Sequence, residues 1–211
     1  MIRAAAWFCP EHCGVYTPAG SWEQLSPASS VSTEIPVLAG RPVKYYARMT
    51  AETRCCLFAA SLALKHAGLD ANSIEIGLLS AGSDGCLRAN AEYFRDYVAN
   101  GRTLGRGNLF IYTLPTSAMG EVAIALSLTG PCMFIQNGCD PAASLGRIGE
   151  QMISDGEAGG MLGLWSDSEA AICLVIEPDG EKAEKKLPLP ATGEMNPLQL
   201  CRALQEMVRR K

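Results

Sequence analysis

Residues 130–141 constrain the fold of this chain more than any other stretch. Residues 132–135 form an apolar run between turn residues, a pattern typical of a strand that is covered on both faces. An Asn-Gly pair then breaks the run, Asp140 suits a helix N-cap, and the proline after it suits the first helical position. The stretch therefore predicts a buried strand, a tight corner at Cys139, and a helix over residues 141–154.

The corner gives Cys139 two interpretations. The partial positive charge at a helix N-terminus favours thiolate over thiol, and a nucleophilic cysteine is commonly housed in this way. The neighbouring Asp140 carboxylate opposes thiolate formation, however, and free cysteine is among the most buried residue types. Cys139 is thus either an acyl-accepting nucleophile or a buried thiol without chemistry.

Apolar runs alternate with amphipathic segments along the rest of the chain. Strands are expected over residues 2–8, 74–80, 132–135, 158–165 and 170–176, with short ones at 31–35 and 45–47. Helices are expected over residues 50–68, 87–99, 118–128, 141–154 and 196–209. The helix at 50–68 is the clearest, because Thr50 can cap its start and Gly68 can stop it.

This order predicts one α/β domain over residues 1–177. We expect a mixed, mostly parallel, five-stranded sheet with helices on both faces and one antiparallel strand at an edge. Residues 178–195 are rich in charge and proline, which is typical of a linker. Residues 196–211 predict a C-terminal amphipathic helix that docks on the domain or on a partner.

Charge and cysteine usage exclude several classes of protein. A net charge of −4 gives no support for nucleic acid or an anionic membrane as a partner. No window approaches the roughly 18 apolar residues of a membrane span. The nine cysteines have no disulfide-framework spacing, so they predict reduced thiols and a cytoplasmic location. Four of them fall within predicted elements and are expected in the core: Cys55, Cys56, Cys132 and Cys173.

One short segment invites a metal site. Cys9, His12 and Cys13 lie close together, and zinc commonly binds such residues. Zinc usually takes four ligands, however, and no second cluster occurs in the sequence. We therefore favour a plain loop at the end of a strand, and expect neither a metal nor a cofactor.

Five segments in order resemble the N-terminal half of β-ketoacyl synthases of the thiolase fold. They are the end of the first long helix, Gly68-Leu69-Asp70; the strand at 74–80 with its Gly-Ser loop; the stretch from Thr113-Leu114-Pro115 to Thr129-Gly130-Pro131; Asn137-Gly138-Cys139 in place of the nucleophile motif; and residues 148–158, where the family has a helix ending in "GEAD". The resemblance covers about residues 45–177. It implies a single thiolase-like half.

The departures from this family bear on activity. The family's second half supplies two catalytic histidines and a lysine, and nothing after residue 177 could supply them. The only histidines are His12 and His66, neither in a matching motif, and Glu121 stands where the family has a histidine. Without a partner for its proton or for an oxyanion, Cys139 lacks most of the machinery for acyl transfer. We therefore favour the interpretation of Cys139 as a thiol without chemistry.

The resemblance also suggests residues that meet partners. In the family, the segment matching Thr113, Leu114, Pro115, Thr116, Ser117, Ala118 and Met119 lines the dimer interface and closes the partner's acyl tunnel. The alternative is that this small-residue segment is only a close-packed core helix. Arg102 and Arg106 could meet an acidic acyl carrier protein, although loop arginines are more often merely solvated.

Three functions follow from this resemblance. The first is a non-elongating, chain-length-factor-like subunit that pairs with a full-length ketosynthase in type II fatty-acid or polyketide synthesis, such as that of an aryl polyene. Because a missing half leaves apolar surface to be covered, a heterodimer offers one cover. The second is a stand-alone acyltransferase that uses Cys139. The third is a homodimeric acyl-binding module.

Overall fold

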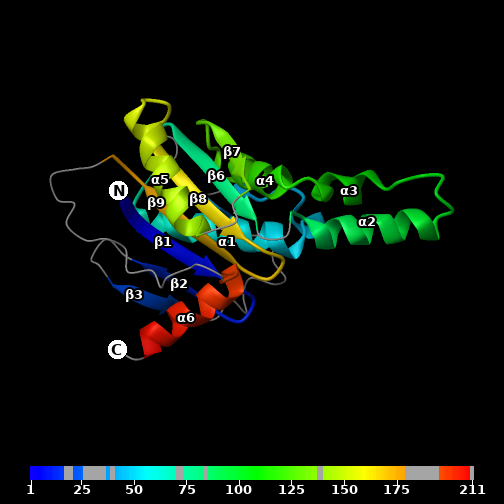
Figure 1. Ribbon diagram of the computed structural model, residues 1–211, viewed down its shortest axis with the longest axis horizontal. Coiled ribbons are helices and arrows are strands. Elements are labelled where there is room, and N and C mark those ends of the chain that lie inside the picture. The colour runs from blue at the N-terminus through cyan, green and yellow to red at the C-terminus, as the bar shows by residue number, and fades with distance from the viewer. Residues whose placement is uncertain are drawn as a thin grey trace.

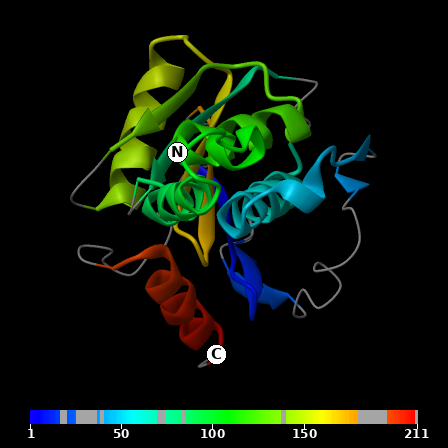
Figure 2. The same cartoon turned by 90° about the vertical axis from the view of Figure 1, so that its right-hand side faces the viewer.

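The computed structural model describes residues 1–16, 21–25, 37–38, 41–69, 74–82, 85–136, 140–178 and 195–209. These residues form a seven-stranded sheet with helices on both faces (Figures 1 and 2). The strands of this sheet are β1 (Ile2–Phe8), β2 (Cys13–Tyr16), β3 (Trp22–Leu25), β6 (Ile76–Gly82), β7 (Cys132–Ile135), β8 (Gly160–Ser166) and β9 (Ala171–Ile176). A separate two-stranded sheet joins β4 (Val37–Leu38) to β5 (Arg41–Pro42).

The sheet order is β3-β2-β1-β9-β8-β6-β7. Strands β8, β6 and β7 are parallel neighbours, whereas β9 is antiparallel to both β8 and β1. Four of the five predicted strands therefore share one direction, which confirms the mixed, mostly parallel arrangement of those five. The antiparallel strand β9 lies inside the sheet, however, and not at an edge as predicted.

Strand β9 is internal because β1 pairs with it on the side away from β8. The segment after β1, predicted as a loop at the end of a strand, is a tight turn in which the amide of Cys9 donates to the carbonyl of His12 at 2.9 Å. It joins β1 to β2 as an antiparallel hairpin, and β3 pairs with β2. These two strands, which were not predicted, extend the sheet beyond β1 and raise its strand number from five to seven.

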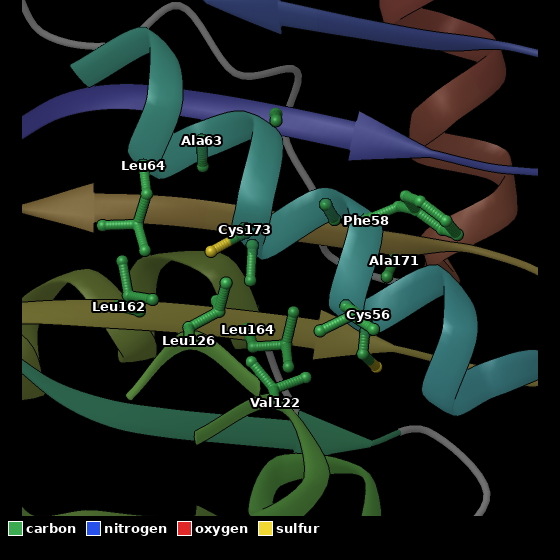
Figure 3. Packing of buried hydrophobic residues seen from close by; sticks show 14 of the residues in the cluster. Cys56, Phe58, Ala63, Leu64, Val122, Leu126, Leu162, Leu164, Ala171 and Cys173 are labelled. Carbon is green, nitrogen blue, oxygen red and sulfur yellow. The ribbon is translucent and has the colours of Figure 1, made fainter. Parts of the chain in front are cut away.

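Helices cover both faces of the sheet. On one face, α1 (Ala51–Ala67) and α4 (Thr116–Leu126) bury the residues of strands β1, β6, β8 and β9 that point toward them. Figure 3 shows this cluster, in which Val122 of α4 lies beside Leu164 of β8, and Phe58 of α1 lies on the same side of the sheet as Ala171 and Cys173 of β9. On the other face, α5 (Pro141–Ser154) and α6 (Pro197–Arg209) cover the alternate residues of the same strands.

The C-terminal helix α6 thus docks on the chain's own domain. Its buried side chains Leu200, Cys201 and Leu204 pack in the cluster that contains Trp7 and Trp22. Helices of this chain therefore cover both faces of the sheet over strands β1, β9, β8 and β6.

The predicted helix caps are confirmed. The Thr50 hydroxyl accepts the amide of Thr53 at 3.2 Å at the start of α1, and Gly68 ends that helix in the left-handed conformation at φ 68°. At the start of α5, the Asp140 carboxylate accepts the amide of Ala143 at 3.2 Å. These ends were predictable because each cap is a local interaction.

Strand β7 corrects a prediction. Residues 132–135 were expected to be buried on both faces, but β7 lies at the sheet edge and, among the described strands, pairs only with β6. Its side chain Met133 is 48% exposed, and Cys132 is exposed and not in the core. An apolar run signals that a strand is covered, but it does not say which chain supplies the cover.

The segment predicted as a short strand at 45–47 is also different. It forms the 3-10 turn η1 (Tyr46–Arg48), preceded by Tyr45 at φ 59°. A left-handed residue cannot continue a strand, which explains the difference. The strand predicted at 31–35 and residues 179–194 of the predicted linker lie outside the described residues.

Helix α2 (Leu87–Ala99) has the predicted bounds. It forms an arm with α3 (Gly107–Phe110) that projects from the body of the molecule (Figure 1). None of the residues of α2 is buried. The arm returns to the body through η2 (Ile111–Thr113) and α4.

Candidate functional site

The strand and the helix predicted on either side of Cys139 are present, and residues 137–139, with Cys139, lie outside the described residues. β7 ends at Ile135 and α5 begins at Pro141, as the sequence predicts. Asp140 has φ 44°, a left-handed conformation that aspartate tolerates better than most residues. Its carboxylate already accepts an amide of the first turn of α5, so it competes with any thiolate for the donors of this helix end.

Neither histidine lies near the end of β7 or the start of α5. His12 lies in the β1–β2 turn, and β1 is four strand positions from β7, or roughly 19 Å at the usual strand spacing. His66 lies in the last turn of α1. The first turn of α1 reaches the carboxyl end of β8, where Glu52 accepts from the Ser166 hydroxyl at 2.9 Å, so His66 lies at the opposite end of the sheet.

The thiols of the core are inert. Burial raises the pKa of the Cys55 thiol to about 12, and it also raises the pKa values of the Cys56 and Cys173 thiols well above their ordinary range. All three were predicted to lie in the core, and all three are buried. A buried thiol with a raised pKa is neither a nucleophile nor a ready metal ligand at neutral pH.

The Cys9–Cys13 segment forms a hairpin turn. The Cys9 thiol donates to the carbonyl of His12 at 3.3 Å. Burial raises the pKa values of both the Cys9 and the Cys13 thiols. Within the described part of the chain, no group of three or more metal-ligating side chains is arranged to hold an ion.

The segment proposed for an interface, residues 113–119, begins where the α2–α3 arm meets the body. The Thr113 carbonyl accepts from the Asn90 side chain at 3.1 Å, and the Ser117 hydroxyl donates to the carbonyl of Ile111. Leu114 and Thr116 are exposed, whereas Met119 is buried in the chain's own core. Pro115, Ser117 and Ala118 are half-buried.

Two arginines of the arm were singled out as carrier contacts. Arg106 pairs with Asp96 of α2 at 3.3 Å, an ion pair that ties α3 to α2. Arg102 is exposed at the turn between these helices, with φ 60°. Both therefore lie on the arm, and only Arg102 is at its tip.

Helix α4 borders a groove of about 640 Å³ on its outer side. Its lining includes Lys44, Arg48, Glu121 and the exposed side chain of Ile124. Glu121, which stands where the family has a histidine, accepts from the Tyr112 hydroxyl at 3.2 Å. The groove thus combines apolar atoms with both signs of charge, and none of the described residues that line it is a cysteine or a histidine.

Tyr112 should make the stability of the chain sensitive to alkaline pH. Burial and the nearby Glu121 carboxylate raise the pKa of Tyr112 to about 12, whereas tyrosine in the unfolded chain ionises near pH 10. Between these values the folded state holds the proton and the unfolded state does not, so stability falls as pH rises from about 10 toward 12. Urea titrations from pH 9 to 11 should show a steeper loss for the wild type than for Tyr112→Phe. Parallel curves would contradict this assignment.

Comparisons with known proteins show which solved structures have a similar fold. No protein-family model and no curated protein matches the sequence. Among solved structures, the ishigamide ketosynthase/chain length factor matches with a TM-score of 0.60 at 14% identity, over 87% of this chain and 63% of that chain. A ketosynthase (ApeO) in complex with its chain length factor (ApeC) from Xenorhabdus doucetiae matches with a TM-score of 0.55 at 13% identity, over 99% of this chain and 90% of the matched chain.

The chain has a ketosynthase-like fold. A beta-ketoacyl synthase from Burkholderia phymatum STM815 agrees, with a TM-score of 0.56 at 14% identity over 85% of this chain and 60% of that one. This ketosynthase-like chain spans less than two thirds of the length of the ishigamide protein and of the Burkholderia protein. It covers nine tenths of the matched chain in the ApeO–ApeC complex, so that chain is of similar size.

Among the described residues of the ketosynthase-like chain, no single helix is long and apolar enough to cross a bilayer. The segments 107–113 and 116–126 reach that length and apolar character only when taken together, and they are bent by 101° relative to each other.

Sequence reasoning missed the exposure of two apolar surfaces. One is the outer side of α4, where Ile124 is 76% exposed, and the other is the apolar stripe of α2. Both had a signal in the sequence, because each helix has a clear apolar pattern. Such a pattern is ordinarily assigned to the chain's own core.

Proposed function

We propose that this chain is a non-elongating, chain-length-factor-like subunit that pairs with a full-length ketosynthase in type II fatty-acid or polyketide synthesis. The proposal rests on one combination of features: a segment like a nucleophile motif without a nearby histidine, together with apolar surface that this chain leaves uncovered. The segment that resembles a ketosynthase nucleophile motif lies between β7 and α5, and no histidine lies near the end of β7 or the start of α5. At the same time the described residues leave an edge strand and apolar side chains of α4 uncovered.

The uncovered surface suits a permanent partner. The free side of β7 presents backbone amides and carbonyls that another strand can pair. Ile124 and Leu114, both more than half exposed, lie on the neighbouring α4 region. Large apolar side chains at such a surface are typical of subunit interfaces. Two structures that this chain resembles contain a ketosynthase and a chain length factor, by their own descriptions, which supports the proposal.

The role of the subunit would be structural. Segment 113–119 would lie against the partner, with Leu114 and Thr116 as the outward residues that limit the length of the partner's acyl tunnel. Cys139 would contribute no chemistry. An acyl carrier protein would approach near Arg102 and Arg106.

Co-expression with a full-length ketosynthase from the same organism tests the pairing. We expect a one-to-one complex by size-exclusion chromatography with light scattering. Ile124→Asp should weaken it at least about 100-fold, because a charge would then be buried among apolar side chains. Met207→Asp, on the far helix α6, is the matched control and should leave the complex intact. Cys139→Ala should also leave the complex and its product unchanged.

Other results would favour the other functions. A monomer that loses an acyl-transfer activity on Cys139→Ala would contradict the proposal and support a stand-alone acyltransferase. A dimer of two copies of this chain, disrupted by Ile124→Asp and indifferent to ketosynthase, would support a homodimeric module.

A further inference from the structure

Helix α2 carries an apolar stripe that no described residue of this chain covers. Leu87, Phe94 and Val98 recur at helical spacing and are 68%, 62% and 40% exposed. With Ala91 they form the stripe. Figures 1 and 2 show α2 on an arm that stands away from the sheet. A helix whose apolar side faces solvent ordinarily packs against another element.

The stripe is held in a fixed position by the opposite side of α2. Tyr93 packs edge-to-face on Phe110, with ring centroids 5.6 Å apart, and stacks on Tyr97 at 6.4 Å. Asn90 donates to the carbonyl of Thr113, and Asp96 pairs with Arg106. These contacts bind α2 to α3 and η2, so the stripe is a defined surface of the folded arm.

Charge distinguishes the arm from the rest of the chain. Residues 85–110 contain four arginines, Glu92 and Asp96, a net charge of +2, although the whole chain carries −4. Arg88 and Arg95 are seven residues apart and therefore form a line beside the stripe. Arg88 pairs with Glu92 at 3.4 Å, but no described carboxylate lies within ion-pair distance of Arg95.

This charge pattern disfavours a second copy of the chain as the occupant. In a parallel pair of stripes, the arginine line would meet the uncharged edge of the other helix, which carries Asn90 and Tyr97 and offers no carboxylate. Two antiparallel stripes packed about a two-fold axis would bring the same edge of each helix together, because such an interface is self-complementary. The arginine lines of the two copies would then face each other and repel. The pattern instead fits a surface whose apolar ridge is edged by carboxylates.

We propose that the apolar stripe of α2, with its edge of Arg88 and Arg95, docks an acidic amphipathic helix of a small carrier-type protein. The carboxylates of that helix would lie along Arg88 and Arg95, and its apolar ridge would cover Leu87, Phe94 and Val98. The choice of a carrier rests on the proposed function. The position and chemistry of the surface do not.

Titration of holo-acyl carrier protein into the chain alone and into its ketosynthase complex tests the proposal. Phe94→Asp and the double variant Arg88→Glu/Arg95→Glu should each weaken carrier binding at least about tenfold. Binding to the wild type should fall between 50 and 300 mM salt, and binding to the double variant should not. Arg147→Glu, an exposed arginine on α5, is the matched charge control and should bind like the wild type.

Each remaining outcome is decisive. Absence of carrier binding to the wild type at 50 mM salt overturns the proposal, as does an equal loss with Arg147→Glu. If the α2 variants lose the ketosynthase and keep the carrier, the stripe belongs to the subunit contact and the proposal is wrong. If no ketosynthase complex forms but the chain alone binds carrier through α2, the docking site stands and the proposed function fails.

Discussion

Leu204→Asp is expected to detach helix α6 from the sheet and to lower the free energy of unfolding by about 4 kcal/mol or more. Leu204 is completely buried between α6 and the sheet. The substitution removes a fully buried aliphatic side chain and puts a carboxylate in its place, and each change is among the most destabilising available. All three tryptophans, Trp7, Trp22 and Trp165, lie in the same cluster. Their emission should therefore shift to the red as water enters.

The control for this prediction lies on the same helix. The Met207 side chain is 36% exposed and reaches solvent. Met207→Asp should therefore lower the free energy of unfolding by no more than about 1 kcal/mol and leave the tryptophan emission unchanged. Chemical denaturation followed by tryptophan fluorescence measures both variants. Wild-type stability and emission in Leu204→Asp would show that α6 does not cover the sheet.

Gly130→Ala is expected to destabilise the fold by about 3 kcal/mol. A Cβ atom at Gly130 would lie 2.6 Å from the amide nitrogen of Gly77 and 2.7 Å from the carbonyl carbon of Ile76. Both are backbone atoms of β6, which cannot move aside without disturbing the centre of the parallel strands. Gly130 also donates its amide to the carbonyl of Ile76 at 3.0 Å, so its place against β6 is fixed. Overpacking against a fixed backbone has a cost of this order.

Gly120→Ala is the control, because this substitution should raise the stability of the fold instead of lowering it. A Cβ atom at Gly120 of α4 meets nothing within 4 Å, and alanine is the better helix former by about 1 kcal/mol. Thermal denaturation should therefore place the midpoint of Gly120→Ala above that of the wild type and that of Gly130→Ala well below it. Similar midpoints for the two variants would contradict the close approach at Gly130.

The parts of the fold that sequence predicted are those set by local interactions. Thr50 and Gly68 bound α1, and Asp140 with the following proline starts α5, because caps act within one helical turn. Strand pairing is not local. The short strands β2 and β3 carry little pattern of their own, and β9 is internal because it pairs with β1, a segment about 170 residues away in the chain, so neither feature could be read from the sequence.

In the candidate site, too, the features set by local sequence could be predicted, and those set by the arrangement of distant segments could not. The corner before α5 and the lack of a suitably placed histidine follow from motifs and a count of two histidines. The separation of His12 from β7 depends on sheet order, and the exposure of Ile124 and Phe94 depends on which surfaces this chain leaves open. An apolar helix has the same pattern whether its own chain or another one covers it.

The exposed edge strand has a practical consequence for labelling. Of the cysteines that the structure describes, Cys132 of β7 is exposed and the others are buried. In a Cys139→Ala background, a thiol-reactive fluorophore would thus react first at Cys132, at the margin where another strand can add. Its brightness and anisotropy would then report in real time whether that margin is open or occupied, without any change to the packed interior.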